Sequence, residues 1–122
     1  FIGSPAMNFI EGEVTRGDAG PQFRCDAGAV VLSGAPDLGD GQRVTLGLRP
    51  EDMQLSESGL SAGVDLVEPT GAELHVNLRS GGAEMTAVFR ERHDLRPGQS
   101  VHLKPVEGKF HLFEPTSGQR LN

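Results

Sequence analysis

The chain has 122 residues and a formal net charge of −6, from 17 acidic and 11 basic side chains. Without a cationic excess to neutralise phosphates, the composition argues against binding to nucleic acid or to an anionic membrane surface. The chain has six Phe but no Trp and no Tyr, which argues against a base-stacking platform. The 17 Gly and 8 Pro favour many short strands over a few long helices.

The length suits one compact domain or two very small ones. A single cysteine, Cys25, cannot form an internal disulfide, and this fits a reducing compartment. No apolar run approaches the roughly 18 residues that a membrane span needs. The first residues lack the features of a signal peptide. Because the chain does not begin with Met, we expect it to be part of a longer protein.

In the first half of the chain, apolar and polar residues alternate with the period of two that is typical of strands. Gly and Pro interrupt this alternation and mark turns. The pattern predicts strands at residues 8–16, 22–25, 29–33 and 43–49, and a weaker one at 51–56. The Gly-rich segment 34–42 is predicted to be a loop, and it is the best candidate for a boundary between two sub-barrels.

The second half shows the same alternation more clearly. It predicts strands at residues 60–68, 73–79, 84–90, 100–105 and 109–113. The segments 39–46 and 96–103 share the pattern G-Q-x-V-x-L, which hints at a duplicated loop-to-strand element. No stretch carries a helical apolar stripe over three turns. About nine short strands, spaced by roughly 8–12 residues, predict an all-β barrel or sandwich with little helix.

The motifs of nucleotide, metal and nucleophile chemistry are missing. The only lysines, Lys104 and Lys109, do not follow a phosphate-binding loop, and no G-x-G-x-x-G precedes a helix. The four histidines are not at metal-ligand spacing, and we interpret them as solvated side chains on strands. Ser33 and Ser80 lie in turns and have no G-x-S-x-G context, and Cys25 has no local Cys/His signature. We therefore predict no catalytic, cofactor-binding or metal-binding residue.

The segment 46–51 (LGLRPE) is unusual for a strand end. A glycine inside a strand often marks a bulge or a close backbone approach, and Arg49 is held extended because Pro50 follows it. Two interpretations remain open. Arg49 forms a buried or interfacial fork with a carboxylate, or the segment is an ordinary strand that ends at a Pro turn.

Four segments, taken together, resemble the C-terminal part of ATP-binding subunits of ABC importers for sugars and glycerol-3-phosphate. Residues 1–9 (FIGSPAMNF) are similar to the connector that follows the ATPase domain in that family. Residues 46–51 and 64–73 (VDLVEPTGAE) resemble its motifs L-G-[IL]-R-P-E and V-x-x-V-E-x-x-G-x-E. Residues 111–113 (HLF), with Gly118 and Leu121, resemble its closing H-L-F…G-x-x-L.

The resemblance implies an OB-like regulatory domain, the transport-associated OB (TOBE) domain, over residues 1–122, with residues 1–9 as the connector. It implies a regulatory and dimerisation role in a subunit that couples ATP hydrolysis to solute uptake. ATP and Mg²⁺ would bind the ATPase domain of the parent protein, so this segment would be no enzyme and would hold no cofactor.

The partners implied by the resemblance are a second copy of the domain, the ATPase domain of the same chain and the membrane permease subunits. The expected location is the cytoplasm, at the inner face of the cell membrane. An alternative function is an OB-like domain that senses a small ligand, an oxyanion or a sugar. A free-standing hydrolase ranks last, because no nucleophile and base are recognisable.

Eight residues are predicted to have structural or interface roles. The polar groups and the turn glycine are Arg49, Glu51, Glu73 and Gly71. The apolar residues, expected to pack the connector against the barrel, are Phe1, Ile2, Met7 and Phe9. In a competing interpretation, the ATPase domain normally covers this apolar stretch, which is otherwise an exposed patch.

Overall fold

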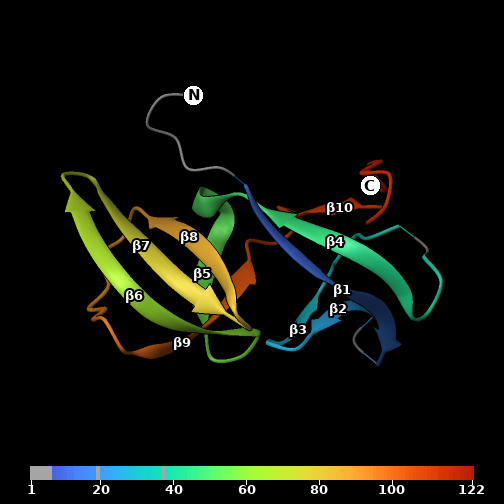
Figure 1. Cartoon of the computed structure of the whole chain (residues 1–122), viewed down its shortest axis with the longest axis horizontal. Coiled ribbons are helices and arrows are strands. Elements are labelled where there is room, and N and C mark those ends of the chain that lie inside the picture. The colour runs from blue at the N-terminus through green and yellow to red at the C-terminus, as the bar shows by residue number, and fades with distance from the viewer. Residues whose placement is uncertain (1–6, 19, 37) are drawn as a thin grey trace.

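The computed structural model describes residues 7–18, 20–36 and 38–122, which form an all-β protein with one short helical turn (Figure 1). This confirms the predicted fold class. The last strand begins later than expected, because Lys109 N–H donates to Val106 O at 2.8 Å and closes a turn first. The strands are β1 (Asn8–Gly17), β2 (Gly20–Cys25), β3 (Gly28–Val31), β4 (Gln42–Leu48), β5 (Met53–Ser56), β6 (Leu60–Thr70), β7 (Glu73–Ser80), β8 (Ala83–Phe89), β9 (Ser100–Pro105) and β10 (His111–Phe113). The 3₁₀ turn is η1 (Pro50–Asp52).

The strands divide between two lobes, which lie on the right and left of Figure 1. The first lobe has the strand order β10-β4-β1-β2-β3. The second has the order β5-β9-β6-β7-β8, in which β9 pairs with both β5 and β6. In the described part of the chain, the ladder between the lobes is one antiparallel pair, Gly28 with Leu60.

Each half of the chain gives its last strand to the other lobe. β5 follows β4 through η1 but pairs with β9, where Met53 lies opposite Pro105. β10 follows β9 but pairs with β4, where His111 lies opposite Gly47. The two lobes therefore have the same strand order, and β10, β4, β1, β2 and β3 correspond to β5, β9, β6, β7 and β8. The fold is a tandem duplication whose halves exchange one strand.

The turns that lead into β4 and β9 confirm this correspondence in their hydrogen bonds. Gly41 N–H donates to Val14 O at 2.7 Å, and Gly98 N–H donates to Val64 O at 2.8 Å. In each turn the following glutamine N–H donates to the carbonyl oxygen three residues earlier, at 3.1 Å. The shared sequence pattern G-Q-x-V-x-L thus occurs at equivalent positions of the two lobes.

Inward-facing residues of the strands form one core that extends through both lobes. Leu46 and Leu112 are fully buried in the first lobe, and Leu60 and Leu103 are fully buried in the second. Removing a leucine side chain of this kind from water contributes about 1.5–3 kcal/mol. The largest fully buried side chains are Phe23, Leu32, Leu46, Leu48, Leu60, Leu78, Leu103, Leu112, Val14, Val44 and Val76.

Two glycines allow close backbone approaches where β3 meets β6, Gly28 between the lobes and Gly59 within the second lobe. A Cβ at Gly28 would lie 2.4 Å from Gly59 O, and one at Gly59 would lie 2.4 Å from Leu103 O. Both glycines have positive φ, 136° and 123°, which other residues rarely adopt. The segment 34–42, singled out above as a possible boundary, runs between β3 and β4 of the first lobe, and the chain passes to the second lobe at η1.

Candidate interface and ligand sites

Alternate residues of β1, β4 and β10 point away from the core and meet on one face of the first lobe. The ladders place Phe9 opposite Gly47, and Gly47 opposite His111. The Phe9 ring is 5.8 Å from that of Phe113 in an edge-to-face arrangement, and the rings of His111 and Phe113 stack at 6.4 Å. Phe9 is 59% exposed. We call this surface, formed by Met7, Phe9, Gly47, His111 and Phe113, the aromatic face.

Gly47 allows the side chains of the aromatic face to cover the strand beneath them. A Cβ at this position would lie 2.7 Å from Met7 Sδ and 2.9 Å from a ring carbon of Phe113. A bulge or a close backbone approach was expected at this glycine, whereas the groups that approach it are side chains. Met7 is thereby held against β4. An aromatic surface of this kind has the composition of protein–protein contacts.

Charges of both signs border the aromatic face. The pKa of His111 is lowered from 6.5, first by burial and then by the positive charges of Arg120 and Arg49, while Asp52 acts in the opposite direction. Glu11 is exposed on β1, opposite Thr45, and so shares the outward phase of Phe9. Basic groups therefore lie towards β10 and an acidic group lies on β1. A twofold contact can bring such opposite edges together.

Arg49 lies between β4 and η1 and is exposed. Its backbone carbonyl accepts a hydrogen bond from Asp52 N–H at 2.9 Å. Within the described ranges, the ion pairs shorter than 4.0 Å include neither Arg49 nor Glu51. Within the chain, the segment is a strand that ends at a Pro turn, and an interfacial fork of Arg49 stays a prediction. Phe1 and Ile2 lie outside the described residues.

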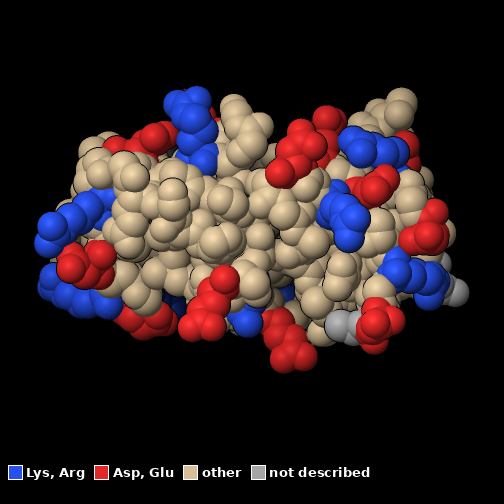
Figure 2. Space-filling model, turned by 90° about the horizontal axis from the view of Figure 1, so that it is seen from below, with Lys and Arg blue, Asp and Glu red and all other residues tan. Residues whose placement is uncertain are grey.

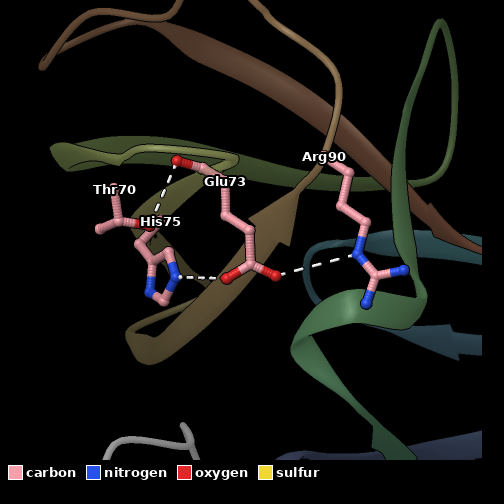
Figure 3. A network of polar contacts seen from close by, with 4 residues as sticks. All are labelled: Thr70, Glu73, His75 and Arg90. Carbon is pink, nitrogen blue, oxygen red and sulfur yellow. Dashed lines mark hydrogen bonds and ion pairs between the residues drawn. The ribbon is translucent and has the colours of Figure 1, made fainter.

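Glu73 is the centre of a polar cluster at the β6–β7 turn (Figure 3). One carboxylate oxygen lies 3.2 Å from His75 Nε2 and the other lies 3.8 Å from Arg90 Nε. The Thr70 hydroxyl donates to the Glu73 backbone carbonyl at 3.3 Å. Gly71 has the positive φ, 63°, that this tight turn requires. The cluster links β7 to the end of β8, although ion pairs this exposed contribute little stability.

Asn8 is a buried polar residue to which sequence reasoning gave no role. Its Oδ1 accepts a hydrogen bond from Thr86 N–H at 2.8 Å, and its Nδ2 donates to Thr86 O at 2.8 Å. Nδ2 also donates to Leu48 O at 3.1 Å and lies 3.4 Å from Met53 Sδ. The alternation of β1 could have revealed this burial, because Asn8 faces the same inward side of the strand as Ile10 and Val14.

Two cavities lie between the lobes. A cavity of about 410 Å³ separates β3 from β5 and the end of β9, and one of about 490 Å³ lies between β1 and the β7–β8 turn. Both are large enough for a small molecule. The first is lined by Ala29, Val30, Val31, Ser33, Gln54, Ser58, Gly59, Lys104, Pro105, Val106, Glu107, Gly108 and Phe110. The second is lined by Phe9, Ile10, Glu11, Cys25, Asp26, Ala27, Thr45, Ser80, Gly81 and Ala83.

The surface seen from below has a broad area without charged side chains, and acidic and basic groups lie around its margins (Figure 2).

Among the residues described, no three His, Cys, Asp or Glu side chains come close enough together to hold a metal ion. In the same residues, no helix has both the length and the apolar character needed to cross a membrane.

Two models of known protein families match the chain, one after the other along the sequence. The MalK OB fold domain matches residues 3–53, and the TOBE domain matches residues 46–113. The chain belongs to the TOBE domain family. This confirms the resemblance read from the four motifs.

Curated relatives match almost the whole chain. An ABC transporter ATP-binding protein of Sinorhizobium fredii, y4oS, is 44% identical over 122 residues, which are 99% of this chain and 33% of the relative. The sn-glycerol-3-phosphate import ATP-binding protein UgpC of Shigella sonnei is 39% identical over 127 residues, 99% of this chain and 35% of the relative. The chain thus spans about a third of the length of these relatives.

A solved structure shares the fold. The cytoplasmic molybdate-binding protein ModG, in a form with molybdate bound, superposes with a TM-score of 0.60 at 20% identity. The match covers 91% of this chain and 96% of that one.

Proposed function

We propose that the chain is the C-terminal regulatory and dimerisation domain of the ATP-binding subunit of an ABC importer for sugars or glycerol-3-phosphate. The observation that carries this proposal is the relatives' coverage. ATP-binding proteins match 97–99% of this chain over only 33–35% of their own length. The rest of such a protein has room for an ATPase domain, which would bind ATP and Mg²⁺. The segment itself then has a non-catalytic role and needs no cofactor.

In this proposal the domain works at the cytoplasmic face of the membrane. Its partners are the ATPase domain of the same chain, the permease subunits that this domain engages, and a second copy of the regulatory domain. The absence of a phosphate-binding loop in the sequence supports the assignment of ATP binding to the ATPase domain and of a non-catalytic role to this segment. Nucleotide turnover by the purified 122-residue chain would contradict it.

The aromatic face supports the dimerisation part of the proposal. Its centre is aromatic, with Phe9 59% exposed, and it is bordered by Glu11 on one side and Arg120 on the other. In a twofold contact, Arg120 of one copy would lie towards Glu11 of the other. Self-contact through this face would hold two subunits together while their ATPase domains open and close.

Sedimentation velocity over a range of concentrations tests this contact. We expect concentration-dependent association of the chain and its loss in Phe9→Ser, because the contact loses its exposed aromatic centre. Leu66→Ser is the matched control, since Leu66 is 44% exposed on β6, outside the aromatic face. A chain that stays monomeric at every concentration, or equal effects of the two variants, would contradict dimerisation through this face.

A second candidate function is the sensing of a small ligand, an oxyanion or a sugar. The ModG structure, which has molybdate bound, favours it because the shared fold covers 96% of that protein. The net charge of −6 counts against an anion site. Isothermal titration with molybdate, phosphate, glycerol-3-phosphate and maltose separates the two candidates. Heat of binding from any of them would favour the sensor.

A further inference from the structure

The carboxamide of Asn8 fills a site that the duplication repeats in the other lobe. Asn8 lies opposite Leu48, the last residue of β4. In the second lobe, β6 and β9 correspond to β1 and β4, and their ladder runs from Gly63↔Ser100 to Leu60↔Leu103. Two further steps of the same register reach Ser58 and Pro105, the last residue of β9. Ser58 therefore stands where the first lobe has Asn8.

The partner of the carboxamide is repeated as well. Thr86 is the fourth residue of β8, and Val31 is the fourth residue of the corresponding strand β3. The Ser58 side chain is too short to reach Val31 as Asn8 reaches Thr86, and Ser58 N–H is bonded to Ser56 Oγ at 3.3 Å. The first inter-lobe cavity, of about 410 Å³, lies at this position and is lined by both Val31 and Ser58.

The backbone of Val31 points into this cavity. Leu32 N–H donates to Pro21 O at 2.9 Å, so this pair of the β2–β3 ladder is hydrogen-bonded. Bonded and non-bonded pairs alternate in antiparallel sheets. The next pair, Val31 with Gln22, is therefore non-bonded, and Val31 directs its N–H and C=O away from β2. In the described chain, β6 pairs with this edge of β3 only at the strand's first residue.

The other groups that surround the Asn8 carboxamide also have counterparts in the cavity. Pro105 takes the place of Leu48, whose carbonyl accepts from Asn8, and Phe110 takes the place of Met53. Pro105 O accepts one long hydrogen bond, from Gln54 Nε2 at 3.5 Å. A carbonyl oxygen has two lone pairs, so it can accept a second donor.

We propose that this cavity binds a small molecule that carries a primary carboxamide, as free glutamine and asparagine do. The carbonyl oxygen of the ligand accepts from Val31 N–H. Its two amide hydrogens donate to Val31 O and Pro105 O, which reproduces the geometry of Asn8 in the first lobe. Phe110 and Val106 pack against its aliphatic part.

The size and charge of the cavity favour a free amino acid over a peptide strand. Lys104 and Glu107 both line it, and they complement the carboxylate and the ammonium group of a zwitterion. β3 ends at Val31 and its other end is covered by β6, so the free edge is too short for a strand to be added. A volume of about 410 Å³ suits a ligand of this size.

The site goes beyond the proposed dimerisation, since it lies between the lobes and uses no residue of the aromatic face. Through this site, the domain would respond to the concentration of a small metabolite in the cytoplasm. Dimerisation and amide binding are measured separately, so either can fail without the other.

Titration of the ¹⁵N-labelled chain with L-glutamine and L-asparagine, followed by NMR, tests the proposal. We expect saturable shifts of the amide signals of Val31, Val106 and Phe110. L-Glutamate and L-aspartate are the matched ligands, because a carboxylate cannot donate to Val31 O and Pro105 O. Absence of saturable shifts at these residues, or equal shifts with the two acidic amino acids, would overturn the proposal.

Two variants locate the ligand. Val31→Pro removes the N–H that points into the cavity and leaves the β2–β3 ladder bonds in place, and we expect at least about tenfold weaker binding. Val31→Ala keeps the N–H and is its control. Ser58→Asn places a carboxamide where Asn8 has one, so it should occupy the cavity and abolish binding. Unchanged affinity in a folded Ser58→Asn variant would overturn the proposal even where Val31→Pro fails to fold.

Discussion

One carboxamide joins the first lobe to β8, and its geometry explains why the position is asparagine. Thr86 offers both an N–H and a C=O towards Asn8, and only a side chain with a donor and an acceptor satisfies both. Asn8 is 7% exposed, so water does not replace the bonds if the side chain is lost. Aspartate has the same shape but no donor, and it would bring an uncompensated charge into the core.

Asn8→Ala should therefore be strongly destabilising. It leaves Thr86 N–H and C=O without partners at a buried position, and we expect a loss of roughly 2–4 kcal/mol in the free energy of unfolding. Asn77→Ala is the control, because Asn77 lies opposite Thr86 but is exposed, and its loss should cost less than about 0.5 kcal/mol. Urea unfolding measures both. Similar midpoints for the two variants would refute the role given to Asn8.

His111 should make the stability of the protein depend on pH. Burial, Arg120 and Arg49 lower the folded-state pKa of His111 below 6.5, so the unfolded chain binds the proton more tightly. The free energy of unfolding then falls as pH drops from above 6.5 to the folded-state pKa, and this loss is complete below that pKa. His111→Gln should show a shallower fall over this window in urea titrations at several pH values. Falls of equal steepness in His111→Gln and in the parent chain would contradict this assignment.

At the scale of the element, local patterns predicted the hairpins well. Leu74, Val76 and Leu78 alternate on β7, and the Gly-Gly turn after Ser80 leads into β8 with register Ser80↔Ala83, as a tight hairpin requires. Neighbouring strands joined by short turns are specified by adjacent residues. The sequence could therefore predict β7 and β8 with their faces. In β6 a register shift between Val64 and Leu66 breaks the predicted alternation, so Val64 is buried and Leu66 is exposed.

The exchange of β5 and β10 between the lobes could not be predicted from local sequence patterns. β10 pairs with β4 across more than sixty positions of sequence, His111 opposite Gly47, and nothing in three residues specifies a distant partner. The only trace was the repeated G-Q-x-V-x-L pattern, which marks corresponding strands but not their pairing. Of the candidate site residues, the motif glycine Gly71 occupies a turn as expected, while the interface roles of Arg49, Glu51 and Glu73 stay predictions.

At the scale of the whole molecule, the exchanged strands make the two lobes dependent on each other. Each lobe has five strands, and one of them comes from the other half of the chain: β10 in the first lobe and β5 in the second. Asn8, the Gly28–Leu60 pair and the hydrogen bond from Ser61 N–H to Ala27 O, at 2.9 Å, add contacts across the junction. A continuous core runs through both lobes. The lobes should unfold as one cooperative unit, in contrast to two domains on a linker.

Leu112→Ala tests this dependence. Leu112 is fully buried and lies in the C-terminal half of the sequence, yet it packs in the first lobe opposite Leu46. The cavity should lower the free energy of unfolding by roughly 2–5 kcal/mol. Because the lobes share strands, hydrogen exchange should accelerate to the same extent at protected amides of β4 in the first lobe and of β7 in the second.

Leu66→Ala is the control for Leu112→Ala, since Leu66 is 44% exposed and its truncation leaves no cavity. It should leave exchange in both lobes close to that of the parent chain. Faster exchange confined to β4 in Leu112→Ala, with β7 unchanged, would mean that the lobes open separately despite the exchanged strands. The proposed dimerisation role would require such a rigid, jointly folded body, because a contact face can transmit a fixed geometry only if the lobes do not move apart.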